Sequence, residues 1–174
     1  MLHSKHKFDV ITIGDVCVDM VLTGGDIVPE FGQKEKLIGD YVLEMGGSSL
    51  IFACQAAKLG LKVAVLGRVG TDQFGELVIS RLQEAGVDTS YLIRTQDVRT
   101  GLGVILSKGE DRAILTYSGT IEAVGPEDVT DEFLSSSRHL HIGSYYLLSG
   151  IRPQFVDITQ RARHLGLTVS LDTN

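Results

Sequence analysis

Two carboxylates follow a β-branched run near the start of the chain. Asp15 and Asp19 stand four residues apart, directly after residues 8–14, which read Phe-Asp-Val-Ile-Thr-Ile-Gly. A run of this type, closed by glycine, predicts a buried strand. Ligands of open α/β sheets bind just beyond the carboxyl ends of the strands. Asp15 and Asp19 are therefore candidates for contacting a ligand, and ordinary surface turn acids are the alternative interpretation.

A glycine pair forms the second candidate. The sequence Met45-Gly46-Gly47-Ser48-Ser49 leads into an apolar segment, residues 48–59, that is followed by glycine. This segment predicts a buried helix with serine N-caps and a glycine stop. Exposed N–H groups at a helix start bind hydroxyls or anions, so Gly46, Gly47 and Ser48 are candidate ligand contacts. A plain tight turn with a serine cap is the alternative.

The other familiar motifs of catalysis and cofactor binding do not occur. Residues 67–75 are glycine-rich but do not read Gly-x-Gly-x-x-Gly, so a dinucleotide site is disfavoured, and Asp72 is predicted to cap a helix at residues 74–85. The chain contains no P-loop, no Gly-x-Ser-x-Gly and no His-Glu-x-x-His sequence. His139 and His141 share one face of a predicted strand, but no third ligand is in view, so we predict structural roles and no metal site.

The elements that position these residues alternate between strand and helix. Strands predicted at residues 8–14 and 62–67 are each followed by a helix, at 48–59 and 74–85. This β-α-β-α order predicts a parallel sheet covered by helices. Later elements of the same type are helices at 126–134 and 153–165 and strands at 138–142 and 167–171.

Several short segments show strand-like alternation and do not fit the strand–helix order. They lie at residues 16–23, 36–44, 91–95, 101–107 and 112–118. A hairpin turn, Lys108-Gly109-Glu110-Asp111, joins the last two segments. We therefore expect a small antiparallel sheet, built from residues 16–23, 36–44 and 91–118, beside the main one.

Composition restricts the partners and the compartment. The 174 residues include 22 acids and 16 bases, for a net charge of −6, and form no basic stripe, so nucleic acid is an unexpected partner and a small molecule is expected. No signal peptide and no apolar stretch approaching the roughly 20 residues of a membrane helix occur. Cys17 and Cys54 lie in apolar stretches, which predicts buried free thiols and a cytoplasmic location.

Taken together, these stretches resemble the ribokinase-like (PfkB) carbohydrate kinases. The resemblance rests on residues 46–60 and 65–75, which look like the family's N-terminal signature. Supporting pieces are Gly14-Asp15 with Asp19, residues 109–115, residues 139–145 and residues 172–174. The resemblance implies a Rossmann-like, mostly parallel sheet with helices on both faces plus a small antiparallel β-sheet lid. Residues 1–174 would form the N-terminal part of one such domain.

The resemblance also implies an activity and a set of contacts. Family members use MgATP to phosphorylate a hydroxyl of a sugar, a sugar acid or a nucleoside, and the lid suggests a homodimer. By position, Asp19 looks like the acid that binds substrate hydroxyls, and Gly46 and Gly47 look like the backbone hinge and sugar contact. Arg112 would pair with a sugar-acid carboxylate, with an exposed hairpin arginine as the alternative. The expected substrate contacts are Asp15, Asp19, Gly46, Gly47, Ser48, Thr100 and Arg112.

Two departures from the family pattern limit these expectations. Ile51 stands where members commonly carry an asparagine, and Ser48, Ser49 or Gln55 would have to replace its hydrogen bond. The family's C-terminal signature, with its catalytic aspartate and anion hole, has no counterpart before Asn174. We therefore expect residues 1–174 to contain no catalytic base and to be inactive alone. A non-catalytic sugar-sensing or dimerisation module is the alternative, which Ile51 favours.

Overall fold

The main sheet is parallel throughout. The computed structural model describes residues 6–173. Five strands pair in the order β5-β4-β1-β8-β9, and every neighbouring pair is parallel. The strands are β1 (Val10–Ile13), β4 (Val63–Gly70), β5 (Leu92–Thr95), β8 (His139–Ile142) and β9 (Thr168–Leu171). The sheet confirms the mostly parallel α/β architecture expected from the alternation of strands and helices.

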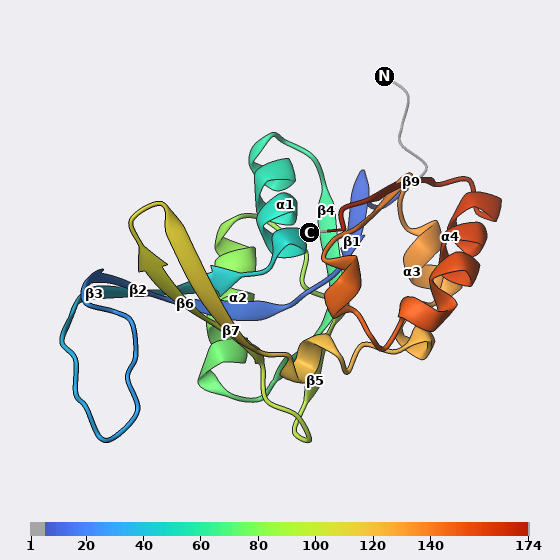
Figure 1. Ribbon diagram of the computed structural model, residues 1–174. Helices are drawn as coiled ribbons and strands as arrows, with labels where there is room; N and C mark the ends of the chain where they lie inside the picture. Colours follow the sequence, from blue (N-terminus) through green and yellow to red (C-terminus); the bar gives the residue numbers. More distant parts are fainter. Residues whose placement is uncertain (1–5, 174) are drawn as a thin grey trace.

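Helices cover both faces of this sheet. They are α1 (Ser48–Lys58), α2 (Gln73–Glu84), α3 (Asp131–Ser135) and α4 (Phe155–His164). Figure 1 shows α3 and α4 together on one side of the sheet, with α1 and α2 on the other. One apolar cluster joins Phe133 and Ile158 to the β1 face of Ile11 and Ile13. The other cluster joins Leu50 of α1 and Leu82 of α2 to strand residues on the opposite face.

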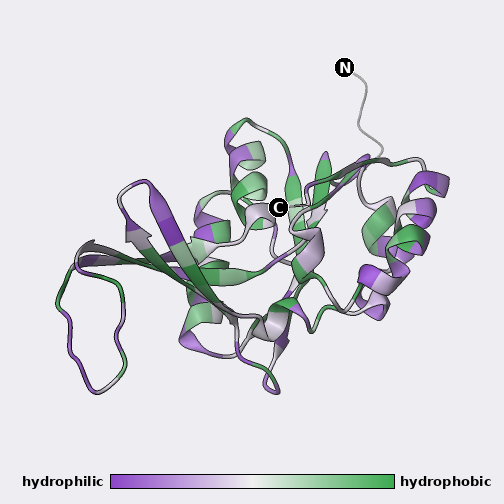
Figure 2. Cartoon of the chain, viewed as in Figure 1, coloured by the Kyte–Doolittle hydropathy of each residue, from purple (hydrophilic) through white to green (hydrophobic). Residues whose placement is uncertain are grey.

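The small sheet stands apart from the main one and forms the lid. Its strands are β2 (Cys17–Gly25), β3 (Ile38–Gly46), β6 (Gly101–Lys108) and β7 (Asp111–Tyr117), in the order β3-β2-β6-β7. Figure 1 shows these strands extending away from the helical part, and Figure 2 shows apolar colouring along the parts of them nearest the main sheet. The expected lid is therefore present.

The lid sheet is mixed, which corrects the expectation of a purely antiparallel sheet. β2 and β3 form one antiparallel hairpin, and β6 and β7 form another. The hairpins meet through a parallel pair, β2 with β6, whose register begins at Cys17 opposite Gly101. Both strands start at the main sheet and run outward, so they meet side by side in the same direction.

The segment at residues 91–95 does not belong to the lid. β5 pairs in parallel with β4, with Gly67 opposite Leu92, at the edge of the main sheet. The reason is the connection through α2, which returns the chain to the sheet beside β4, as the usual β-α-β crossover does. The four residues of β5, Leu-Ile-Arg-Thr, have no local feature that distinguishes a lid strand from a strand at the sheet edge, so the sequence pattern misplaced β5.

Two predicted helices are shorter than expected. Residues 126–134 divide into a 3-10 turn, Pro126–Asp128, and α3, which begins after Thr130 caps it through Phe133 N–H. Pro153 lies in a second 3-10 turn before α4, so α4 starts at Phe155. No helix within residues 6–173 is long and apolar enough to cross a membrane.

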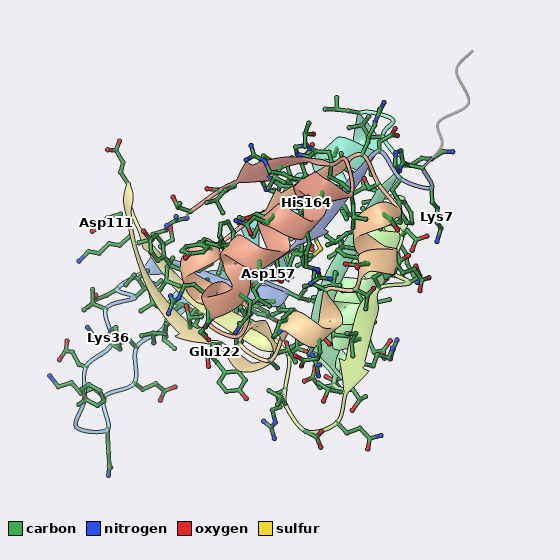
Figure 3. The ribbon with its side chains drawn as sticks, turned by 90° about the vertical axis from the view of Figure 1, so that its right-hand side faces the viewer. Lys7, Lys36, Asp111, Glu122, Asp157 and His164 are labelled. Atoms are coloured by element: carbon green, nitrogen blue, oxygen red, sulfur yellow. The ribbon has the colours of Figure 1, made fainter. Side chains whose placement is uncertain are left out.

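A long loop, residues 26–37, joins β2 to β3 at the outer end of the lid. Lys36 binds Asp26 and Glu30, each at 2.7 Å, and these bonds close the loop on itself. Figure 3 shows Lys36 on this loop and Asp111 at the tip of the β6–β7 hairpin, both far from His164 on α4. The lid thus has two projecting ends beyond the region where it meets the main sheet.

Candidate functional site

A cavity of about 280 Å³ lies where the base of the lid meets the N-terminus of α1. Its polar lining comes from Asp15, Asp19, Ser48, Arg112, Thr116 and Ser144. Its apolar lining comes from Cys17, Ile51, Ile105, Ile114, Ile121 and Leu147. The cavity therefore brings together five of the expected contact residues: Asp15, Asp19, Gly47, Ser48 and Arg112.

Asp15 fixes the start of α1. Its side chain is buried, and its carboxylate accepts the backbone N–H of Ser48 at 3.1 Å and of Ser49 at 3.3 Å. The helix N-cap is Gly47, and no serine side chain caps the helix, which corrects the expected serine caps. Two of the N–H groups at the helix start are therefore bonded to Asp15 and are not available to a ligand. Asp15 holds the floor of the cavity in place.

Asp19 sits in a space that two glycines leave open. A Cβ atom on Gly46 would lie 2.4 Å from Asp19 Cγ, and one on Gly103 would lie 2.6 Å from Asp19 Oδ1. Gly46 is thus required to admit the Asp19 side chain. Within the described residues the carboxylate accepts no hydrogen bond, so it is free to bind a ligand. Burial raises its pKa above the ordinary value, the charge of Asp15 raises it further, and Arg112 opposes both.

Gly47 connects β3 to α1 in a conformation that suits glycine. Its φ is +91°, in the left-handed region, and a Cβ there would lie 2.0 Å from the Asp15 carbonyl oxygen. Any residue with a Cβ atom in place of Gly47 would push the start of α1 away from Asp15. The second glycine of the pair therefore serves close packing of two backbone segments at the floor of the cavity.

Ser144 is a site residue that the sequence patterns did not single out. It follows β8, is buried, and has a φ of +50°, which is rare outside glycine. Its hydroxyl lies 2.8 Å from the hydroxyl of Ser48. This bond ties the loop after β8 to the first turn of α1. A serine following a strand carries no distinctive signal, so only the fold reveals its position.

Arg112 reaches the cavity from β7 together with Ile114 and Thr116. Alternate residues of a strand point to the same face, so the three side chains form one row along β7. The Arg112 side chain makes no hydrogen bond or ion pair within residues 6–173. The alternation along residues 112–116 was the signal that could have identified Ile114 and Thr116 beside Arg112.

Thr100 does not belong to this cavity. Its hydroxyl accepts the Gly70 N–H at 2.9 Å and donates to Asp72 Oδ1 at 2.7 Å, and its own N–H binds Asp72 Oδ2 at 2.8 Å. Thr100 and Tyr117 instead line a separate hollow of about 730 Å³. Tyr117 is odd-numbered on β7, so it points to the face opposite Arg112.

The structure confirms the predicted role of Asp72 as a helix cap. Its Oδ1 accepts the Gly75 N–H at 2.9 Å at the start of α2. Burial alone would raise the pKa of Asp72, but hydrogen bonds from Thr100, Gly75 and Phe74 outweigh it and hold the pKa below its ordinary value. The carboxylate therefore remains charged where it joins α2 to the base of β6.

Ile51 projects from the first turn of α1 into the cavity. About half of its side chain is exposed, and it lines the cavity with Ser48. Ser49 is buried and donates to the Ile13 carbonyl at 3.4 Å, while Gln55 lines a second hollow, which Ile51 also borders. Neither residue lines the cavity itself. The wall at this position is therefore apolar.

His139, His141 and Cys54 lie outside the cavity, whereas Cys17 contributes to its apolar lining. Ser170 Oγ lies 2.9 Å from His139 Nε2 and 2.8 Å from His141 Nδ1, and His141 stacks on Phe52 with 3.9 Å between ring centroids. Burial lowers the pKa of both histidines. Cys17 and Cys54 are buried and free, as expected, and burial raises the pKa of each thiol.

The described residues contain no ready site for a metal ion, and their glycine-rich turn contains none for a phosphate group. Residues 6–173 contain no group of three or more metal-binding side chains. In the glycine-rich turn at 67–75, the N–H of Gly70 binds Thr100, that of Thr71 binds the Thr95 carbonyl, and that of Gly75 binds Asp72. Since these donors are already paired, the turn offers no ready cradle for phosphate groups.

A parallel α/β domain with a separate β-sheet lid over a partly polar cavity is the architecture of ribokinase-like proteins. The sequence profile of the pfkB family carbohydrate kinases matches residues 7–174. The chain therefore belongs to the pfkB family of carbohydrate kinases.

Curated relatives are sugar kinases of greater length. The chain is 28% identical over 144 residues to 5-dehydro-2-deoxygluconokinase of Listeria monocytogenes, which covers 80% of this chain and 42% of the relative. It is 30% identical over 143 residues to the Bacillus subtilis enzyme of the same name, with 79% and 42% covered. The chain thus spans less than half of the length of these relatives.

Solved structures share the fold. A PfkB protein from Polaromonas superposes with a TM-score of 0.81 at 23% identity, covering 96% of this chain and 56% of that one. Fructokinase from Xylella fastidiosa with bound ATP gives a TM-score of 0.78 at 24% identity, covering 96% and 52%. These likenesses confirm the arrangement of main sheet and lid.

Proposed function

We propose that this chain is the substrate-binding and lid-bearing part of an ATP-dependent kinase that phosphorylates a hydroxyl of a sugar, a sugar acid or a nucleoside. The observation that carries the proposal is the Asp19 carboxylate, which faces the cavity beneath the lid without a hydrogen bond from the described residues. A carboxylate in this setting accepts hydrogen bonds from two hydroxyls. Family membership supports the phosphoryl-transfer chemistry.

The other groups of the cavity have complementary tasks in this proposal. Asp15 and Gly47 fix the position of the start of α1, so that the ligand contacts a rigid surface at the base of the cavity. Arg112 on β7 and Asp19 on β2 contact the ligand from the lid. Because both come from the lid, a bound ligand would draw the lid onto the main sheet and exclude water, which would otherwise compete for the phosphoryl group.

The nucleotide and the catalytic base belong, in this proposal, to the rest of a longer parent protein. Phosphoryl transfer needs a base for the attacking hydroxyl and groups that stabilise the phosphate charge. The glycine-rich turn at 67–75 offers no cradle of this kind, and the aligned part of this chain covers only 42% of a curated relative. ATP would supply the phosphoryl group and Mg²⁺ would neutralise its charge. The expected location remains the cytoplasm.

Two measurements test the proposal. Calorimetry on residues 1–174 should detect binding of at least one member of a panel that includes 5-dehydro-2-deoxygluconate, fructose, ribose and adenosine, chosen from the names of similar proteins. Asp19→Asn should weaken that binding about tenfold or more, since hydrogen bonds to a charged acceptor are among the strong ones. Asp40→Asn, on the exposed part of β3, is the matched control.

A coupled assay of ADP release should show turnover by the parent protein and none by residues 1–174. Turnover by residues 1–174 alone would contradict the assignment of the base to the remainder. Binding without phosphorylation by the parent would instead support the second candidate, a non-catalytic sugar sensor. Ile51 favours that candidate, because an apolar side chain replaces a polar contact in the cavity wall.

We further propose that the lid pairs with a second copy of the chain. β7 is an edge strand whose seven residues are all exposed, and Leu115 and Tyr117 present large apolar surfaces on it. Unprotected edge strands with apolar side chains are templates for pairing with another chain. Leu102 and Val104 of β6 continue this apolar surface beside β7.

A further inference from the structure

The outer edge of β7 presents backbone groups at every second residue. β7 pairs with β6 on one side, and no strand of the described residues pairs with it on the other. The turn between β6 and β7 has two residues and closes on the pair of Lys108 with Asp111, which in such turns is hydrogen-bonded. Arg112 is next and therefore faces the free edge, where its N–H binds the Asp111 side chain at 2.8 Å. By alternation, Arg112, Ile114 and Thr116 all face this edge.

This edge is complementary to itself. Two antiparallel strands related by a two-fold axis have that axis perpendicular to the sheet, so the same face of the lid lies on the same side in both copies. Matching all seven residues of β7 places Ile114 opposite the partner's Ile114, and Arg112 opposite the partner's Thr116. All three residues that face the free edge then pair with one another, whereas a shift by two residues leaves one of them without a counterpart.

The side chains also match in this register. On the cavity face, Ile114 lies between Ile105 of its own chain and the partner's Ile114. On the opposite face, Leu115 lies beside the partner's Ala113, so a large side chain meets a small one. A shift by two residues in one direction places Arg112 opposite an isoleucine, and a shift in the other places it beyond the end of the partner's β7. The edge therefore fits a second copy in one register.

Pairing in this register brings an arginine of the partner to the substrate cavity. Asp19 lies opposite Gly103, which lies opposite Thr116, in one row across the lid. The partner's Arg112 extends this row, with its Cβ atom about 5 Å from that of Thr116, which lines the cavity. Neighbouring strands are about 4.8 Å apart, so its backbone is about 14 Å from that of Asp19 along the sheet.

The chain's own Arg112 lies further from Asp19 than the partner's does. It is two strands away from Asp19 and four residues along β7 from Thr116, which places the two backbones about 17 Å apart along the sheet. A change of side-chain rotamer, which is common when proteins associate, turns the partner's guanidinium toward Thr116. The Asp19 carboxylate then faces a positive charge supplied by the second copy.

We propose that two copies pair β7 with β7, with Ile114 at the two-fold axis, so that the partner's Arg112 completes each substrate cavity. The inference rests on the proposed function and on the proposed pairing of lids, to which it adds the register and a residue shared between copies. Arg112 is then a substrate contact that acts across the interface, and the site of a single chain is incomplete.

Disulfide formation between cysteine variants tests the register. Residue 113 of one copy lies opposite residue 115 of the other, in a pair that is not hydrogen-bonded and has its Cα atoms about 4.5 Å apart. Ala113→Cys mixed with Leu115→Cys should therefore give a disulfide-linked dimer. Either variant alone should not, because its two new cysteines are about 8 Å apart. Val156→Cys, exposed on α4, replaces Leu115→Cys in the control mixture and should give none.

Mixed dimers test whether Arg112 acts across the interface. Asp19→Asn and Arg112→Gln should each weaken ligand binding about tenfold or more at every site of their own dimers. When the two variants are mixed at low concentration and then concentrated, each mixed dimer has one site with Asp19 intact and Arg112 supplied by the other chain. Calorimetry should therefore find about a quarter of all sites at wild-type affinity, and none if Arg112 acts within its own chain.

The converse mixture is the matched control. Wild type is mixed with the double variant Asp19→Asn/Arg112→Gln. The mixed dimer has no intact site if Arg112 acts across the interface, and one if it acts within its own chain. About a quarter of all sites bind tightly in the first case and about half in the second. The probes are 5-dehydro-2-deoxygluconate, fructose, ribose and adenosine, as in the test of the proposed function.

Each outcome decides a different claim. The absence of crosslinks, a crosslink in Ala113→Cys or Leu115→Cys alone, or a mixture without restored sites overturns the inference and leaves substrate binding by Asp19 standing. Failure of every probe to bind wild type overturns the proposed function together with the inference. Unfolding curves for every variant establish that a lost site reflects the missing group and not loss of the fold.

Discussion

At the scale of single residues, Asp15 has the largest expected effect on stability. It is buried and accepts two N–H groups at the start of α1. Asp15→Ala should lower the free energy of unfolding by about 2–3 kcal/mol, because two helix donors lose a charged partner inside the protein. Asp15→Asn keeps one acceptor oxygen and should cost about 1 kcal/mol. Urea unfolding measures both changes, with Asp97→Ala in an exposed loop as the control; equal stability of Asp15→Ala and that control would contradict the role.

Asp19 should make stability depend on pH in the opposite sense to a salt-bridged acid. Its folded pKa is raised above the ordinary 3.8, first by burial and then by Asp15. The folded state therefore binds the proton more tightly than the unfolded chain. The stability linked to that proton is complete below about pH 3.8 and is lost as the pH rises through the folded pKa.

Asp19→Asn carries no charge at any pH and does not lose this stability. We expect the free energy of unfolding of Asp19→Asn, relative to wild type, to increase from acid toward neutral pH. Urea unfolding across this range measures the difference. A relative stability that falls with rising pH would mean that Asp19 is stabilised as a carboxylate. The same variant should weaken ligand binding, so the charge is kept for function at a cost in stability.

At the scale of elements, the sequence predicted the type of each strand and helix better than its position in the two sheets. The buried strands and helices around Asp15 and Gly47 were predictable because apolar periodicity and glycine stops are local signals. β5 was misplaced, and β2 with β6 was not expected to be parallel, because both depend on which strands meet in space. Local sequence does not encode which strands pair. The position of β5 follows from the crossover through α2, and the parallel pairing of β2 with β6 follows from two hairpins that both start beside the main sheet.

The contact between α2 and the lid provides a test at this scale. Thr100 joins the base of β6 to Gly70 and to Asp72, the cap of α2. Thr100→Val keeps the shape of the side chain and removes both hydroxyl bonds, which should lower the free energy of unfolding by about 1–3 kcal/mol. Ligand affinity should remain within about twofold, because Thr100 lies outside the cavity. Thr159→Val on α4 is the control, and a loss of affinity with normal stability would return Thr100 to the substrate site.

For the molecule as a whole, the site depends on four separate stretches of chain that meet only in the fold. Asp19 and Arg112 come from the two lid hairpins, Ser48 comes from the start of α1, and Ser144 comes from the loop after β8. The sequence suggested Asp19, Gly47, Ser48 and Arg112 through family motifs and turn chemistry. It could not suggest Ser144, Ile105 or Ile114, since ordinary residue types become informative only when the fold places them together.

The proposed pairing of two lids along the free edge of β7 leads to the last prediction. Leu115 on β7 is 63% exposed, and Val156 on α4 is 64% exposed, so the two form a matched pair of apolar surface residues. If lids pair along β7, sedimentation velocity should show a dimer whose share grows with protein concentration. Leu115→Lys should abolish it, because a lysine on an edge strand opposes pairing with another strand, whereas Val156→Lys should leave it unchanged. Both variants should unfold within about 0.5 kcal/mol of wild type, as exposed substitutions usually do. Monomers at every concentration, or equal effects of the two lysines, would exclude the lid as the contact surface.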